Sequence, residues 1–209
     1  MEQSNNIITW NKINFFCNNN VFYPKESTIG ILNEVESILP VYTEKVPIID
    51  LCCGIGVIGI SILLNNKNRF CKFYGFDNDT HSIDVCDKNI KFHSINGEVY
   101  LWEAGDKLFN IKKDGIVVCN PPFLPETTDK IYYKKSFITS GNNGLEVILK
   151  CFQSLNGTNH ILILKSLKSQ VPKILKEVNN DFRLIRQKEQ KIESNYIIAF
   201  TTWRQKKQE

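Results

Sequence analysis

Four consecutive residues, Asn120-Pro121-Pro122-Phe123, have the types and order suited to chemistry at a planar nitrogen. Amide and aryl-amino nitrogens are poor nucleophiles because their lone pairs are delocalised. The Asn120 side-chain oxygen and the Pro121 carbonyl can both accept hydrogen bonds from one NH₂ group, and such bonds strengthen as the nitrogen attacks. The prolines stiffen the backbone, and Phe123 offers a face for stacking. We therefore predict that these four residues are catalytic; the alternative is a rigid turn after a strand.

A second chemical feature is a glycine turn that follows an apolar run ending in Asp50. Residues 54–59 match the dinucleotide fingerprint G-x-G-x-x-G, whereas residues 50–56 match D-x-x-x-G-x-G, the first motif of class I S-adenosylmethionine (SAM) methyltransferases. Glycines let a ligand approach the backbone closely, and the following helix presents free N–H groups. Asp50 favours the second interpretation, because its carboxylate would repel a pyrophosphate but can hold the ammonium of a methionine moiety.

Two further acids extend this ligand site. Asp77 ends the next predicted strand, where a carboxylate can accept hydrogen bonds from both ribose hydroxyls, in NAD enzymes as well as in SAM enzymes. Asp106 follows a third strand and can accept from an adenine amino group; the alternative is a turn acid without a ligand. The residues predicted to bind the cofactor are Asp50, Cys52, Gly54, Gly56, Asp77, Asn78, Asp106 and Asn120.

These residues require a scaffold in which strands and helices alternate. Apolar patterns predict strands at 46–51, 72–77, 98–102, 115–119, 160–164, 182–187 and 196–203, and helices at 28–39, 57–64, 79–92, 145–155 and 171–178. Alternating β and α units imply a three-layer, mostly parallel sheet. The last two strands have no helix between them and so imply an antiparallel end. This α/β, Rossmann-like arrangement of seven strands with an antiparallel C-terminal strand is typical of class I methyltransferases.

The segment before the first of these strands contains a predicted hairpin and a helix. Residues 13–17 and 21–23 flank a turn at 18–20, and Ser27 or Thr28 can cap the following helix. We expect residues 1–40 to pack on a methyltransferase domain formed by residues 41–209. Residues 124–141 form a loop long enough to act as a lid, in which Tyr132, Tyr133 and Phe137 would cover the target group.

Composition limits the other classes of function. The 209 residues fit one domain, the net charge of +4 is mild, and no apolar run approaches the length of a membrane span. The polar N-terminus lacks the apolar core of a signal peptide, so we expect a cytoplasmic protein without membrane contact. None of the seven cysteines forms a C-x-x-C pair, which predicts buried reduced thiols and no metal site.

Taken together, these motifs resemble the class I N-methyltransferases of the small methyltransferase domain group, and within it the HemK-type release-factor glutamine methyltransferases. Residues 21–28 resemble that family's V-x-x-P-R-x-x-T segment, residues 77–89 its D-x-[SN]…N pattern, and residues 141–146 its G-x-x-G-L-[ED] segment. Cys52 departs from the usual glycine, Phe123 from tyrosine and Lys25 from arginine. Because few residues precede Val21, we expect this chain to lack the separate N-terminal helical domain of bacterial members.

The resemblance implies SAM as cofactor, S-adenosylhomocysteine as product, and methyl transfer to a planar amide or amino nitrogen. It favours a glutamine side chain of a protein such as a release factor. A nucleic-acid base (adenine N6 or guanine N2) and a small-molecule amine stay open as acceptors, with Lys112-Lys113, Lys134-Lys135 and residues 204–207 as candidate phosphate contacts. Short members of the family use a small partner subunit. From a different class, a NAD-dependent oxidoreductase has only the literal G-x-G-x-x-G in its favour.

Overall fold

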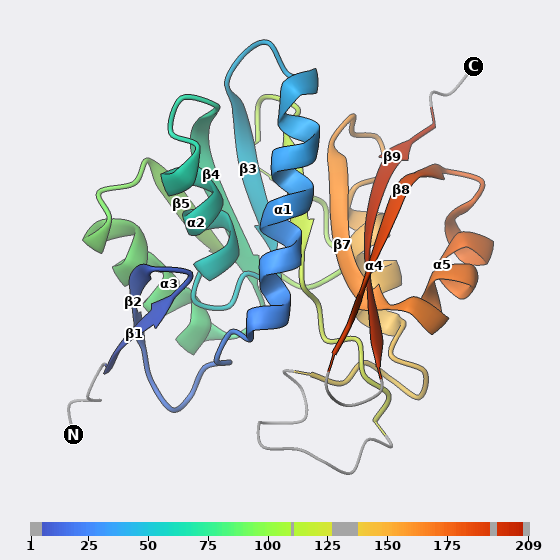
Figure 1. The fold of residues 1–209 in the computed structure, drawn as a ribbon, viewed down its shortest axis with the longest axis horizontal. Coiled ribbons are helices and arrows are strands. Elements are labelled where there is room, and N and C mark those ends of the chain that lie inside the picture. The colour runs from blue at the N-terminus through green and yellow to red at the C-terminus, as the bar shows by residue number, and fades with distance from the viewer. Residues whose placement is uncertain (1–5, 110, 127–137, 193–195, 207–209) are drawn as a thin grey trace.

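The computed structural model describes residues 6–109, 111–126, 138–192 and 196–206, and its centre is a seven-stranded sheet (Figure 1). The strand order is β5-β4-β3-β6-β7-β9-β8. Neighbouring strands are parallel except where β9 lies antiparallel between β7 and β8. This confirms the predicted fold class, including the antiparallel C-terminal strand. The strands are β3 (Val46–Leu51), β4 (Phe70–Asp77), β5 (Gly97–Leu101), β6 (Ile116–Cys119), β7 (Ile161–Leu167), β8 (Phe182–Lys191) and β9 (Ile197–Gln205).

Helices cover both faces of the sheet and bury a separate hydrophobic cluster on each. Side chains alternate along a strand, so Ile48 joins one cluster and Ile49 joins the other. This burial on both sides explains why the central strands are continuous apolar runs. One face is covered by α1 (Ile29–Ile38), α2 (Val57–Asn65) and α3 (Thr80–Phe92), and the other by α4 (Glu146–Ser154) and α5 (Val171–Val178).

The direction of the sheet order reverses between β3 and β6. From β3 the chain proceeds to β4 and β5 on one side, and it then crosses to β6 and β7 on the other. Leu51 and Cys119, the last residues of β3 and β6, are paired in register. The loops that follow these two strands therefore begin side by side, at the lower edge of the sheet in Figure 1. Open α/β sheets bind ligands at such a reversal.

The N-terminal hairpin forms, but with a different partner strand from the one predicted. Strand β2 (Ile13–Cys17) pairs with β1 (Asn6–Trp10), and not with residues 21–23, which the structure leaves outside the strands. The turn at Asn11 and Lys12 has φ values of 46° and 65°, the left-handed pair that matches the twist of a tight hairpin. The pairing prediction was wrong because it relied on the later asparagine run as the turn.

A buried side chain on α3 makes three of the hydrogen bonds around the base of this hairpin. Asn89 on α3 is fully buried; its Oδ1 accepts from the Phe16 N–H at 2.7 Å, and its Nδ2 donates to the Phe16 carbonyl at 3.2 Å and to the Ile55 carbonyl at 2.9 Å. The division of the chain at residue 40 stays a prediction. The proposed lid aromatics at 132, 133 and 137 lie outside the described residues. No helix in the described ranges has the length and apolar character needed to cross a bilayer.

Candidate active site

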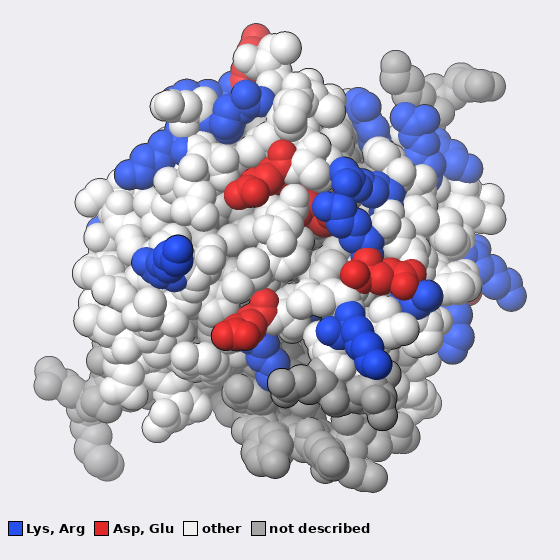
Figure 2. Space-filling model, in the orientation of Figure 1, with Lys and Arg blue, Asp and Glu red and all other residues white. Residues whose placement is uncertain are grey.

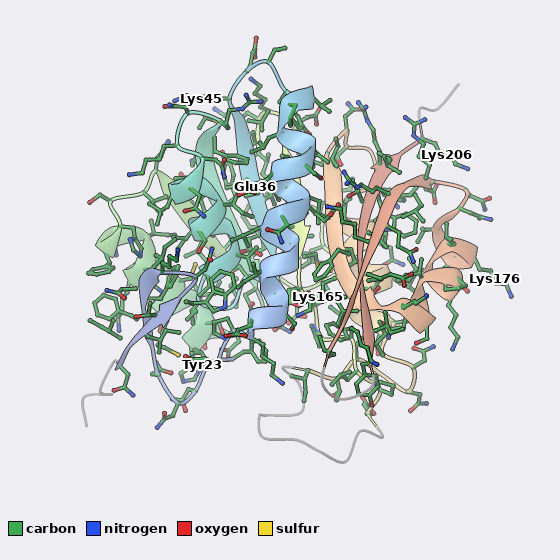
Figure 3. The ribbon with its side chains drawn as sticks, viewed as in Figure 1. Tyr23, Glu36, Lys45, Lys165, Lys176 and Lys206 are labelled. Atoms are coloured by element: carbon green, nitrogen blue, oxygen red, sulfur yellow. The ribbon has the colours of Figure 1, made fainter. Side chains whose placement is uncertain are left out.

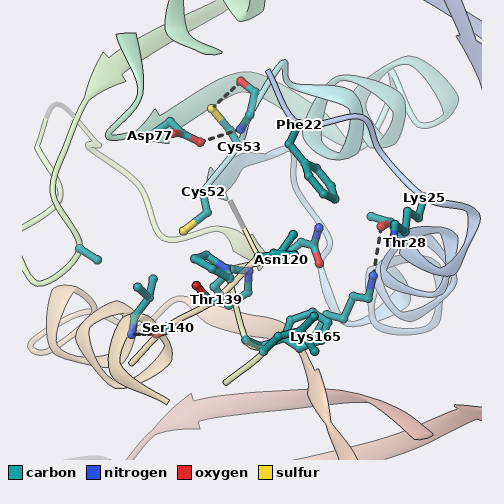
Figure 4. Close-up of a pocket in the computed structure, with 18 of the residues that line it drawn as sticks. Phe22, Lys25, Thr28, Cys52, Cys53, Asp77, Asn120, Thr139, Ser140 and Lys165 are labelled. Atoms are coloured by element: carbon teal, nitrogen blue, oxygen red, sulfur yellow. Dashed lines mark hydrogen bonds between the residues drawn. The ribbon is translucent and has the colours of Figure 1, made fainter. Parts of the chain in front are cut away.

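A cavity of about 1410 Å³ opens at the carboxyl ends of the central strands (Figure 4). Single ligand pockets usually measure about 300–1,000 Å³, so this cavity has room for a cofactor and an acceptor group together. It brings together most of the predicted site. The predicted residues that line it are Cys52, Gly54, Asp77 and Asn78 from the cofactor set, and the run Asn120 to Phe123 from the catalytic set.

The glycine loop after β3 offers open backbone to this cavity. Gly54 has a φ of 53°, and a Cβ built on it would meet no atom within 4 Å. Its N–H donates to Asp77 Oδ2 at 2.8 Å, while the Asp79 N–H donates to Asp77 Oδ1 at 3.0 Å. Burial, and then the neighbouring Cys52, raise the pKa of Asp77 to about 7. The end of β4 thus holds the loop in place and leaves open space beside Gly54 on the cavity side.

Asp50 lies behind the loop, outside the cavity lining formed by the described residues. Its side chain is fully buried, and Oδ2 accepts from the Gly59 N–H at 2.9 Å. Burial raises the pKa of Asp50 to about 8, so at neutral pH this structure favours the neutral acid. The sequence predicts a fixed anion here, whereas the buried position favours the neutral acid. Asp50 Oδ1 has no hydrogen-bond partner among the described residues, and a cofactor role for this acid stays a prediction.

Gly56 and Asp106 also lie outside that lining. At Gly56 φ is 84°, and a Cβ would approach Cys86 Sγ to 2.7 Å, so this glycine permits α3 to pack against the loop. Asp106 is exposed, and its carbonyl accepts from Trp102 Nε1 at 3.1 Å. A carboxylate that sequence reasoning missed, Glu103, lines the cavity instead and accepts from Asn78 Nδ2 at 3.4 Å. Cofactor contacts of Gly56 and Asp106 stay predictions.

The acceptor end of the cavity begins immediately after β6. Asn120 Oδ1 is buried, yet it has no hydrogen-bond partner among the described residues. Such an orphaned acceptor costs free energy unless a ligand supplies the donor. The chain then turns through Pro121 and Pro122, and Phe123 reaches the cavity wall. The arrangement fits an NH₂ group held at Asn120 and a planar group stacked on Phe123.

Lys165, on β7, is the principal residue that sequence reasoning missed. Its side chain points into the cavity and is only 4% exposed (Figures 3 and 4). Nζ donates to Ser27 Oγ at 3.1 Å and to Thr28 Oγ1 at 3.2 Å, and it lies 5.7 Å from the centre of the Phe123 ring. Burial, and then repulsion by Lys25, lower the pKa of Lys165 to about 7. A lysine inside a buried apolar strand, next to the strand predicted at 160–164, was the signal that could have identified it.

The contacts of Lys165 explain a detail at the start of α1. Thr28 occupies the cap position there, as predicted, but its side chain makes no capping hydrogen bond. Its hydroxyl accepts from Lys165 instead. The segment just before α1 therefore lines the cavity, and Lys165 of β7 joins it through hydrogen bonds to Ser27 and Thr28. The residues of this segment that line the cavity are Phe22, Pro24, Lys25, Ser27 and Thr28.

The family model described as "Methyltransferase small domain" matches residues 13–192 of the chain. The chain is 30% identical over 156 residues to the release factor glutamine methyltransferase of Bacillus cereus, covering 68% of this chain and 53% of that protein. It is 32% identical over 157 residues to the enzyme of the same description from Mycoplasma mycoides, covering 69% and 54%. The chain thus spans about half the length of these relatives.

A relative of another kind is the ribosomal RNA large subunit methyltransferase G of Colwellia psychrerythraea, 31% identical over 120 residues, or 55% of this chain and 30% of that protein.

Among solved structures, the E. cuniculi Mtq2–Trm112 complex, responsible for methylation of the translation termination factor eRF1, matches with a TM-score of 0.61 at 22% identity, covering 90% of this chain and 99% of that chain. TrmK of M. capricolum, in complex with S-adenosyl-homocysteine, matches with a TM-score of 0.57 at 13% identity, covering 81% and 66%. At these identities the structural matches show a shared fold.

Proposed function

Because the chain belongs to the methyltransferase small domain family, a class I methyltransferase family whose cofactor is SAM, we propose that it transfers a methyl group to a planar nitrogen. The observation that carries this proposal is Asn120 Oδ1, a buried acceptor without a partner among the described residues, in a cavity large enough for cofactor and acceptor. The open space at Gly54 fits the cofactor, with Asp77 and Asn78 beside it.

In this mechanism the protein positions the acceptor and aligns its lone pair. When bound, SAM supplies an electrophilic methyl group on a sulfonium. Asn120 Oδ1 and the Pro121 carbonyl accept hydrogen bonds from the two N–H groups of the methyl-accepting nitrogen. These bonds stabilise the positive charge that develops on the N–H groups as the nitrogen attacks. Phe123 orients the plane of the acceptor by stacking. Positioning of this kind contributes more than acid–base chemistry, because alkylation itself makes the nitrogen acidic.

We favour a protein glutamine as the acceptor. Its support is the similarity to release factor glutamine methyltransferases, which is greater in extent than the similarity to the ribosomal RNA enzyme. Two of the basic residues considered for phosphate contacts have protein partners: Lys113 pairs with Glu44 at 2.7 Å, and Lys206 donates to the Asn179 carbonyl. Acidic and basic side chains are mixed on the face shown in Figure 2. Lys134 and Lys135 lie outside the described residues.

A small partner subunit is part of this proposal. Its support is that the structural neighbour Mtq2 forms a complex with Trm112. Activity assays should therefore be run with the isolated chain first, and size-exclusion chromatography of the native complex from its source would show whether a second subunit accompanies the chain.

The test is a labelling assay with methyl-tritiated SAM and three acceptor pools. These are a release factor with a Gly-Gly-Gln loop, the same factor with that glutamine changed to alanine, and unmodified cellular RNA. Label in the first pool alone supports the glutamine acceptor, whereas label in RNA supports the base acceptor. Asn120→Ala should reduce transfer by about 10²-fold or more while SAM affinity stays nearly unchanged. Equal labelling by wild type and Asn120→Ala would refute the mechanism.

A further inference from the structure

Three cysteines from different parts of the chain meet beneath the active-site cavity. Cys52 follows β3, Cys119 is the last residue of β6, and Cys151 lies on α4. Their Sγ atoms all lie within 4.8 Å of one another, and Cys119 Sγ is 3.7 Å from Cys151 Sγ. The expectation of no metal site considered only spacing along the chain, and no spacing pattern could reveal a cluster that the sheet and a crossover helix assemble.

The separations of the sulfur atoms suit a thiophilic metal ion. With Zn–S bonds of about 2.3 Å, tetrahedral coordination places neighbouring sulfur atoms about 3.8 Å apart. The pair Cys119 and Cys151 already has this spacing, and the third sulfur needs a shift of no more than about 1 Å to reach it. Soft thiolates select zinc and copper over magnesium or calcium. Three thiolates leave a net charge of −1 with Zn²⁺ but −2 with Cu⁺, so the divalent ion suits this buried position better.

The backbone of Cys52 is an independent indication. Cys52 has a φ of 56°, in the left-handed region that side chains with a Cβ rarely adopt. A non-glycine residue held there costs on the order of 1–2 kcal/mol, which glycine would avoid. With this backbone conformation, the Sγ atom of Cys52 lies within 4.8 Å of the other two sulfur atoms. Such an outlier at a ligand site is a physical reason to look for a function of the side chain.

The surroundings provide both a rigid base and a route of access. Cys119 and Cys151 are fully buried in the hydrophobic cluster under α4 and α5. Cys52 is half-buried and projects into the cavity, as Figure 4 shows. Two ligands would thus be fixed in the core, and the third would face the cavity together with an open coordination position, the pattern of zinc sites that have three protein ligands.

We propose that Cys52, Cys119 and Cys151 form a binding site for a thiophilic divalent cation, Zn²⁺, with its fourth position directed into the cavity. Binding forms three sulfur–metal bonds and releases three thiol protons to the solvent, and water occupies the fourth position. No change of oxidation state is required. The ion would connect the glycine loop, the strand end before Asn120 and α4. This proposal does not depend on which nitrogen, if any, the protein methylates.

The test is a titration of the metal-free full-length chain with Cd²⁺ and Zn²⁺ under a non-thiol reductant. Cd²⁺ should produce the ultraviolet thiolate-to-metal charge-transfer band with the intensity of three thiolates, and Zn²⁺ should displace it at one equivalent. Cys52→Gly and Cys151→Ser should weaken Zn²⁺ binding by at least about 100-fold, since loss of an outer-shell partner alone costs about 10–100-fold. The matched control is Cys71→Ser, which removes an exposed thiol on β4 and should leave binding unchanged.

Cys52→Gly makes the test independent of folding, because glycine suits the left-handed backbone, so the metal-free variant should unfold at a temperature no lower than that of the wild type. The proposal is overturned if Cys52→Gly binds Cd²⁺ with wild-type affinity and band intensity. It is also overturned if Cys71→Ser abolishes the band, or if the wild-type band has the intensity of a single thiolate.

Discussion

The side-chain amide of Gln170 donates a hydrogen bond to the carbonyl of Phe123 at 2.7 Å. The same Nε2 donates to the carbonyls of Asn143 and Gly144 at 3.1 and 3.2 Å, and Oε1 accepts from the Leu167 N–H at 2.9 Å. One buried side chain therefore joins the end of the catalytic run, the glycine segment before α4 and the end of β7. Rigid support of this kind holds acceptor groups within the small tolerance that catalysis requires.

Replacing Gln170 with alanine should destabilise the protein and misplace Phe123. The change leaves buried carbonyls without a donor, and each unsatisfied group costs about 1–3 kcal/mol, so we expect the free energy of unfolding to fall by about 2–4 kcal/mol. Urea denaturation measures this. Gln187→Ala, on exposed β8, is the control and should change stability by less than about 0.5 kcal/mol. Equal effects of the two variants would contradict this role for Gln170.

Two glycines with left-handed backbones provide a matched pair for a steric test. A Cβ on Gly144 (φ 71°) would lie 2.1 Å from the Phe123 carbonyl oxygen, whereas a Cβ on Gly157 (φ 81°) would meet nothing within 4 Å. Gly157→Ala should cost about 1–2 kcal/mol of backbone strain. Gly144→Ala should cost at least about 2 kcal/mol more, because backbone must move. Similar thermal unfolding of the two variants would show that the close approach at Phe123 is not maintained in solution.

Changes at Phe123 should affect binding and rate together if its ring stacks on the acceptor. Phe123→Ala should raise KM and lower kcat, because stacking both binds the planar group and orients it. Phe123→Tyr should retain activity, since the aromatic face is kept. Steady-state kinetics with the acceptor identified by labelling would measure both. A normal KM for Phe123→Ala would place the acceptor elsewhere in the cavity.

Asp77→Ala should weaken SAM and S-adenosylhomocysteine equally. Loss of charge-assisted hydrogen bonds to the ribose should cost about 1.5–3 kcal/mol of binding free energy. Part of this loss would arise through Gly54, whose N–H donates to the same carboxylate. Titration calorimetry measures both ligands, with Asp84→Ala on the exposed side of α3 as the control. If Asp77→Ala bound both ligands with wild-type affinity, the ribose would not bind at Asp77.

The buried Lys165 should make stability depend on pH in a defined direction. Its pKa falls from 10.5 to about 7 on burial, so between these values the unfolded chain binds more protons and stability rises with pH. Wild type should therefore gain about 2–3 kcal/mol relative to Lys165→Met between pH 7 and pH 9. A pH-independent difference between wild type and Lys165→Met would mean that Lys165 titrates normally.

The amino-acid sequence by itself determined the order of elements and the edge at which the site forms. Strand β3 has the predicted bounds, and the other strands differ from prediction by a few residues. Local periodicity carries this information, because burial on both faces requires continuous apolar runs and a helix requires a repeat of 3.6 residues. Since parallel strands present their carboxyl ends at one edge, Gly54, Asp77 and Asn120 could be assigned to one cavity from their positions alone.

Only the tertiary structure decided how individual side chains are used. The strand partner of β2, the burial of Asp50, the insertion of Lys165 between α1 and Phe123, and the meeting of Cys52 with Cys119 and Cys151 all depend on contacts between distant parts of the chain. No local pattern encodes them, because such contacts are selected by packing and by the need to satisfy buried polar groups after the sheet has formed. The sequence indicates which edge carries the chemistry, and the packing around that edge decides which side chains face it.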